Sequence, residues 1–173
     1  MLKNIKVNLE VLESMLYFWQ ATKDREKVGE QYIISISEKE EMKAVYDGEF
    51  KAESVRLVLS AISNRELLNS TNKKERKFWN NNMWMLEDMG MMNQMLTPLK
   101  VLNLSAIRED FPQFGKESVE ICFFPGHTDT YLIKGDRLYI NFFKIFAAEE
   151  NVLHVEGMPI MDFIKEKIAE MAV

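Results

Sequence analysis

The sequence predicts a single α+β domain, in which a layer of about four helices packs on an antiparallel β-meander and a last helix closes the fold. Apolar residues recur every three to four positions over much of residues 1–97, and every second position over parts of residues 98–173. Because the helices precede the strands instead of alternating with them, a parallel α/β fold is disfavoured. A chain of 173 residues can bury such a core without disulfides or structural metals.

The first two helices are expected over about residues 8–22 and 26–46. Asn8 begins the first, since asparagine is favoured at helix N-caps. Asp47-Gly48 stops the second. Residues 31–37 alternate apolar and polar side chains as a strand would, yet apolar residues there also recur every four positions. We favour the helix, and the strand stays an alternative.

The third and fourth helices are expected over about residues 52–63 and 70–96. Ser70 opens the fourth, and Gly90 either ends it early or kinks it. Thr97-Pro98 stops the apolar pattern, because proline and the residue before it are disfavoured inside a continuing helix. The basic residues near its start are interpreted as a solvated helix face.

An antiparallel sheet of three to five strands is expected across about residues 100–156, followed by a closing helix over 159–171. Period-two alternation predicts one buried set of side chains, namely Val119, Ile121, Phe123 and Ile133. Glu120 and Lys134 should point outward. Pro159 suits the first turn of the closing helix.

Composition excludes several classes of protein. No apolar run approaches the roughly 18 residues that a membrane span requires, and residues 1–7 lack the features of a signal peptide. The single cysteine, Cys122, excludes an internal disulfide and a multi-cysteine zinc site. A net charge of -5 argues against general nucleic-acid binding. We therefore expect a cytoplasmic protein that binds neither membranes nor nucleic acids.

Sequence motifs give no sign of a common enzyme class. Neither glycine-rich phosphate loop, GxGxxG nor GxxxxGK[ST], is present, and the GxSxG motif of serine hydrolases is also missing. His127 and Asp129 share a turn and could present polar groups, although such a short pattern is also common in purely structural turns. His154 is interpreted as a partly buried, hydrogen-bonded side chain, and Cys122 as a buried, inert cysteine. We expect no cofactor and no metal site.

The fourth helix carries the most unusual segment of the chain. Asn80, Asn81 and Asn82 lie between two tryptophans, although each asparagine costs a helix about 0.7 kcal/mol relative to alanine. Asn82 is expected to point inward and to be hydrogen-bonded, because it lies three residues after Trp79 and four before Leu86. It serves either the structure or a polar ligand.

Methionines are concentrated in one stretch: six of the 12 lie between Met83 and Met95. Methionine fills irregular gaps in cores and also makes adaptable binding surfaces. If this stretch is exposed, it predicts an interface with another copy of the chain or with a protein partner. The residues expected there are Met91, Met92, Met95 and Leu96.

Two functional hypotheses follow. The first is a non-catalytic binding or interaction protein that self-associates. The second is a small-ligand-binding protein or enzyme with a pocket between the 70–96 helix and the β-meander. The residues expected to line that pocket are Trp79, Asn82, Arg65, His127 and Asp129.

Overall fold

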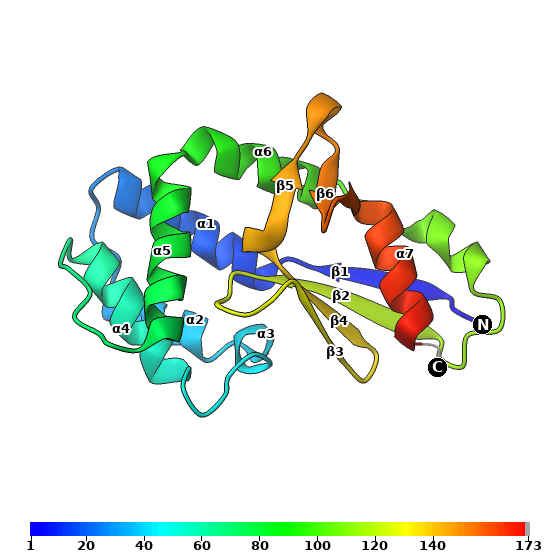
Figure 1. Ribbon diagram of the computed structural model, residues 1–173, viewed down its shortest axis with the longest axis horizontal. Coiled ribbons are helices and arrows are strands. Elements are labelled where there is room, and N and C mark those ends of the chain that lie inside the picture. The colour runs from blue at the N-terminus through cyan, green and yellow to red at the C-terminus, as the bar shows by residue number, and fades with distance from the viewer. Residues whose placement is uncertain (172–173) are drawn as a thin grey trace. The chain divides into compact units, whose positions relative to one another are not determined.

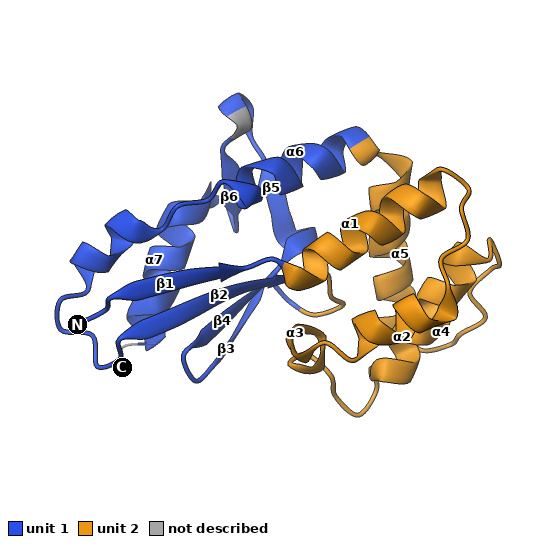
Figure 2. Ribbon diagram, turned by 180° about the vertical axis from the view of Figure 1, so that it is seen from behind, with its two compact units in different colours: residues 1–9, 90–123, 129–173 blue, residues 10–89, 124–128 orange. Residues whose placement is uncertain are grey.

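The computed structural model of the protein describes residues 1–171 and has a mixed α+β architecture with two sheets (Figure 1). Its contacts divide the chain into two compact units (Figure 2). The helical unit comprises residues 10–89 and 124–128. The strand-bearing unit comprises residues 1–9, 90–123 and the described chain from 129 onward. The single domain, with a helical half up to about residue 97 and a sheet half from about residue 98, stays a prediction.

The helical unit contains five helices in its described residues: α1 (Glu10–Lys23), α2 (Glu30–Ser37), α3 (Glu40–Lys43), α4 (Ala52–Ser63) and α5 (Lys73–Glu87). Helix α2 packs on α4, and α5 packs on both α1 and α4. Large aromatic side chains fill the centre of the core: Phe18, Trp19, Phe50 and Phe78. The predicted first and third helices are confirmed. Residues 31–37 are helical, as favoured.

The predicted helix over 26–46 is wrong as one continuous element. Helix α2 ends at Ser37, and the chain is extended at Lys39 before α3 begins. The carbonyl of Ser37 accepts a hydrogen bond from the Tyr46 hydroxyl at 2.6 Å, and its hydroxyl accepts one from Arg56 Nε at 3.1 Å. These tertiary bonds satisfy the end of α2 and compensate for the interruption of the helix.

The predicted helix over 70–96 is also interrupted. Helix α5 ends at Glu87, and Asp88 separates it from α6 (Met89–Lys100). Helix α6 continues past Pro98 instead of stopping there. The missing proline N–H leaves the Gln94 carbonyl without its helical donor, and because Gln94 is exposed, water can replace that donor.

The strand-bearing unit contains a four-stranded sheet with the order β1-β2-β4-β3. Its strands are β1 (Asn4–Asn8), β2 (Ser118–Phe124), β3 (Tyr131–Lys134) and β4 (Arg137–Asn141). The predicted meander is wrong in its strand order, because β2 neighbours β4 and not β3. β1 was not predicted and pairs with β2 in parallel, with Val7 opposite Ile121. Asn8 therefore ends a strand, and its amide donates to Glu120 Oε1 at 3.4 Å.

A second, three-stranded sheet completes this unit. It is formed by β5 (Ile145–Ala147), β6 (Leu153–Val155) and β7 (Met158–Pro159), with the order β5-β6-β7. The closing helix, α7 (Ile160–Met171), follows directly and confirms the predicted helix over 159–171. Within residues 1–171, no helix is both long and apolar enough to cross a bilayer.

The predicted alternation along β2 is confirmed only in part. Val119, Ile121 and Phe123 are buried, but so are Cys122 and Phe124. Protein therefore covers both sides of the strand beyond Ile121, and alternation is lost there. Lys134 is exposed as expected, whereas Ile133 is only half-buried. Glu120 is mostly covered and forms ion pairs with Lys6 and Arg137.

Candidate functional site

A pocket of about 600 Å³ lies within the helical unit, between α1, α4 and α5. Its volume is in the range typical of small-molecule sites. One wall is apolar and is formed by Ile62, Leu67, Trp79, Met83 and Leu86. Polar and charged side chains complete the lining: Thr22, Lys23, Arg25, Arg65, Glu66 and Glu87. The pocket thus offers an apolar surface beside polar and charged groups.

Two helices end at this pocket in the same way. Arg25 follows α1 and Arg65 follows α4, and both have left-handed backbones, with φ of 64° and 58°. In each case, the N–H of the next residue donates to the carbonyl four residues before the arginine, at 2.8 and 2.9 Å. This helix-ending motif favours glycine, and another residue in that conformation costs about 1 kcal/mol. Both arginines line the pocket at a conformational cost.

The two arginines differ in their partners. Arg65 donates a hydrogen bond from its guanidinium to the Thr22 carbonyl at 2.9 Å. It therefore holds the last turn of α1 as well as lining the pocket. The Arg25 side chain is exposed and makes no hydrogen bond or ion pair within the described residues. Of these two arginines, Arg65 is thus structural in part, and Arg25 is available to a ligand.

Two buried polar atoms in the pocket-lining residues lack hydrogen-bond partners. They are the Thr22 hydroxyl oxygen and the Trp79 indole nitrogen, and both belong to the part of the chain that the structure describes. Thr22 is only 6% exposed. Because an unsatisfied buried polar group costs about 1–3 kcal/mol, such atoms are uncommon in folded proteins. Each atom exposes less than 1 Å² to solvent, so a ligand in the pocket could bond to it only after the side chain moves toward the pocket.

Asn82 belongs to the core and not to the pocket. It is 0% exposed, and its side-chain oxygen accepts a hydrogen bond from Trp19 Nε1 at 2.9 Å. Its side-chain nitrogen donates to the Phe78 carbonyl, also at 2.9 Å. The prediction that Asn82 is buried and hydrogen-bonded is confirmed, and both of these bonds are internal. Trp79 is half-buried.

The five predicted ligand residues therefore do not form one group. Trp79 and Arg65 line the same pocket, whereas Asn82 lies in the core. His127 takes part in a different network of the helical unit, and Asp129 is an exposed residue of the strand-bearing unit. The pocket also contains Arg25 and other residues that the sequence reading missed. One signal could have found Arg25: the run Asp24-Arg25-Glu26 after one helix resembles Asn64-Arg65-Glu66 after another.

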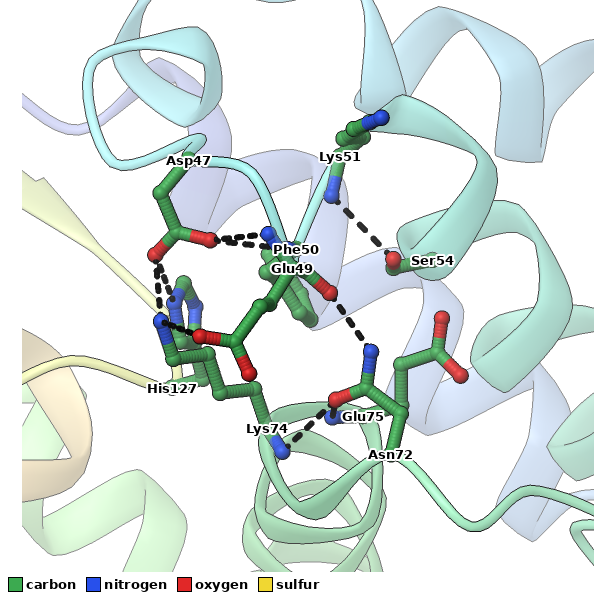
Figure 3. A network of polar contacts seen from close by, with 9 residues as sticks. All are labelled: Asp47, Glu49, Phe50, Lys51, Ser54, Asn72, Lys74, Glu75 and His127. Carbon is green, nitrogen blue, oxygen red and sulfur yellow. Dashed lines mark hydrogen bonds and ion pairs between the residues drawn. The ribbon is translucent and has the colours of Figure 1, made fainter.

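His127 lies in a network with Asp47, Phe50 and Lys74 (Figure 3). His127 is 4% exposed, and its ring stacks on Phe50 with 3.9 Å between ring centroids. Nε2 is 3.5 Å from Asp47 Oδ2, close enough for an ion pair but too long for a strong hydrogen bond. Neither ring nitrogen has a hydrogen-bond partner among the described residues.

The Asp47 carboxylate is held from several sides. Oδ1 accepts hydrogen bonds from the backbone N–H groups of Glu49 and Phe50, both at 2.8 Å, and Oδ2 is 2.9 Å from Lys74 Nζ. Partial burial alone would raise the pKa of Asp47, but the Lys74 ammonium and the two N–H groups outweigh it and lower that pKa. Burial lowers the pKa of His127, and the Asp47 carboxylate opposes this change without reversing it.

This network predicts a loss of stability in mild acid. An unfolded histidine titrates near pH 6.5, above the lowered pKa of folded His127. As the pH falls below about 6.5, the unfolded chain takes up the proton first, so the free energy of unfolding should fall. Thermal melts between about pH 5 and pH 8 should show this slope. His127→Gln should reduce it, whereas His154→Gln leaves the His127 network intact and should retain the contribution of that network to the slope. An unchanged slope in His127→Gln would contradict the prediction.

The residues expected at an interface are mostly covered by the chain itself. Met92, Met95 and Leu96 are buried in the structure, and Met91 is half-buried. They therefore do not form the exposed apolar patch on which the predicted self-association depended.

Residues 1–171 contain no group of three or more histidine, cysteine, aspartate or glutamate side chains that could hold a metal ion. Comparison with protein-family models, with curated proteins and with solved structures finds no match for this chain. The geometry of the pocket is therefore the basis for a functional proposal.

Proposed function

We propose that the chain is a binding protein that holds a small amphipathic molecule in the pocket of its helical unit. The observation that carries the proposal is an apolar wall in a pocket where two of the lining residues, Thr22 and Trp79, each hold an unpartnered buried polar atom. This combination is typical of ligand sites, in which apolar surface supplies affinity and a few polar groups fix orientation.

The apolar wall supplies the contact area for such a ligand. Trp79 presents an indole ring, and Met83 and Leu86 follow it on the same face of α5 at the next turns. Methionine is flexible and polarisable, so Met83 can adapt to ligands of different shapes. A ligand that covers this wall removes apolar surface from water, which favours binding by about 25 cal/mol per Å² before the costs of association.

The unpartnered atoms supply directional contacts. The Trp79 indole can only donate a hydrogen bond, whereas the Thr22 hydroxyl can donate or accept. A ligand oxygen near the indole would satisfy its N–H. A small adjustment of either side chain into the pocket would be repaid by a hydrogen bond that the free protein lacks. We therefore expect the ligand to carry an oxygen acceptor on an apolar body.

A neutral fluorescent probe, N-phenyl-1-naphthylamine, tests this function. We expect saturable binding with a single site, reported by energy transfer from tryptophan to the probe. Met83→Trp should fill the pocket and weaken binding about tenfold or more, which corresponds to about 1.4 kcal/mol. Met91→Trp is the matched control, because it places the same side chain at a half-buried helical methionine outside the pocket.

Two results would contradict the proposed function. One is the absence of saturable binding by the folded wild-type protein. The other is equal weakening by Met83→Trp and Met91→Trp, because a site elsewhere on the chain would not distinguish them. Circular dichroism of each variant verifies that it is folded.

A further inference from the structure

We propose that the ligand of this pocket is an organic anion, whose carboxylate or phosphate head group lies among Lys73, Arg76 and Lys77 on α5. This inference rests on the proposed function and specifies the chemical class of the ligand. It depends on a second cavity, which adjoins the pocket and has a different charge.

The second cavity has a volume of about 750 Å³ and lies within the helical unit. Leu67 and Trp79 line both this cavity and the pocket, so the two adjoin across these side chains. We call it the basic groove. Its remaining lining residues are Leu68, Lys73, Arg76, Lys77, Asn80 and Asn81. A ligand against Trp79 could therefore extend from the apolar pocket into the basic groove.

The charges in the basic groove are all of one sign. Lys73, Arg76 and Lys77 line it, and no carboxylate does. Spacings of three and four residues place these cations on one face of α5. None of the three side chains forms an ion pair within residues 1–171. The groove therefore carries an uncompensated positive charge.

The unpaired positive charge belongs to one face of α5, as a fourth basic residue in the same turns shows. Lys74 is paired with Asp47 Oδ2 at 2.9 Å and with Glu49 Oε1 at 3.5 Å. Glu75, the one acidic residue in the first turn, accepts a hydrogen bond from the Ser70 hydroxyl at 2.6 Å. Helix α5 thus pairs Lys74 on one side and leaves the three groove cations for another partner.

The chemistry of the groove suits an oxyanion. A guanidinium such as that of Arg76 can donate two parallel hydrogen bonds to a carboxylate or phosphate, and lysines add point charge. Asn80, the next residue along this face, adds a carboxamide that can donate to an oxyanion. The groove cations also lie in the first two turns of α5, where the helix dipole favours negative charge. We therefore place the apolar body of the ligand beside Trp79 and its head group in the basic groove.

Two probes that share one ring skeleton test the inference. N-phenyl-1-naphthylamine is neutral, and 8-anilino-1-naphthalenesulfonate adds an anionic group to it. We expect the folded protein to bind the anionic probe about tenfold or more tightly than the neutral one. The double variant Arg76→Gln with Lys77→Gln should abolish this preference and leave binding of the neutral probe unchanged.

The matched control removes two positive charges elsewhere. Lys43→Gln with Lys51→Gln changes the net charge equally, at exposed positions of the same unit outside both cavities. This control should retain the preference for the anionic probe. Decanoate and decyl phosphate should displace that probe, whereas decanol, which has no charge, should displace it only at much higher concentration.

The outcomes separate the two proposals. If the wild type binds neither probe, the proposed function and this inference both fail. If it binds the neutral probe but does not prefer the anionic one, only the inference is overturned. It is also overturned if the groove and control variants lose the preference equally. Displacement by single-stranded oligothymidylate at lower concentration than decanoate would overturn it in favour of a polyanion.

Discussion

Replacing Asn82 with alanine should lower the free energy of unfolding by about 1–3 kcal/mol. The Asn82 carboxamide is completely buried and joins the Trp19 indole to the Phe78 carbonyl. Alanine would leave the Trp19 N–H buried without its acceptor, and the loss of the carboxamide would open a small cavity beside it. The gain in helix propensity, about 0.7 kcal/mol, is smaller than this cost.

The measurement is a urea or thermal melt without added ligand. Asn80→Ala is the control, because Asn80 lies in the same helix and is exposed. It should leave stability unchanged or raise it by up to about 0.7 kcal/mol. In a Trp19→Phe background, Asn82→Ala should cost less, since the indole donor is already gone. If Asn82→Ala and Asn80→Ala had the same Tm and the same free energy of unfolding, the structural role of Asn82 would be contradicted.

Helix spacing was enough to predict the direction of Asn82 but not its partner. The position of Asn82 relative to Trp79 and Leu86 placed it on the inward face of α5. Trp19, whose indole N–H donates a hydrogen bond to Asn82, lies 63 residues earlier in the chain. Periodicity describes one helix face at a time, so it cannot report which distant side chain meets that face.

The sheet shows the same division between local pattern and long-range pairing. Alternation around Ile121 identified β2, and a glycine turn with φ of 62° at Gly135 lies between β3 and β4. The strand that the sequence did not reveal is β1, whose five residues contain two apolar side chains. A segment with two apolar residues is too short for its alternation to identify a strand. Its partner, β2, begins more than 100 residues later in the chain.

Pocket residues could be predicted only where the sequence of a single helix was itself unusual. Trp79 was found because it borders an unusual asparagine run. Arg25 and Thr22 belong to α1 and its end, and they meet α5 only through tertiary packing. The basic groove was read as a solvated face, because a sequence shows that Lys74 and Lys77 are both basic but not that only Lys74 is paired.

Replacing Gly126 with alanine should lower the free energy of unfolding by about 1–3 kcal/mol, through overpacking. A Cβ at this position would lie 2.5 and 2.8 Å from two ring carbons of Phe124. The Phe124 ring is 0% exposed, so it cannot swing into solvent to make room. Asn81 also donates to the Gly126 carbonyl at 3.4 Å, and a displaced backbone would lengthen that contact.

Gly48→Ala is the matched control for this steric effect. A Cβ there meets nothing within 4 Å, and Gly48 lies in an exposed turn of the same unit. Alanine at such a site restricts the unfolded chain and should be neutral or stabilise the protein by about 0.4–1 kcal/mol. For a protein of this size, 1 kcal/mol corresponds to about 2–4 °C in Tm, so thermal melts should move the two variants in different directions. If both variants melt together with the wild type, the Phe124 ring has room to move and the predicted clash is wrong.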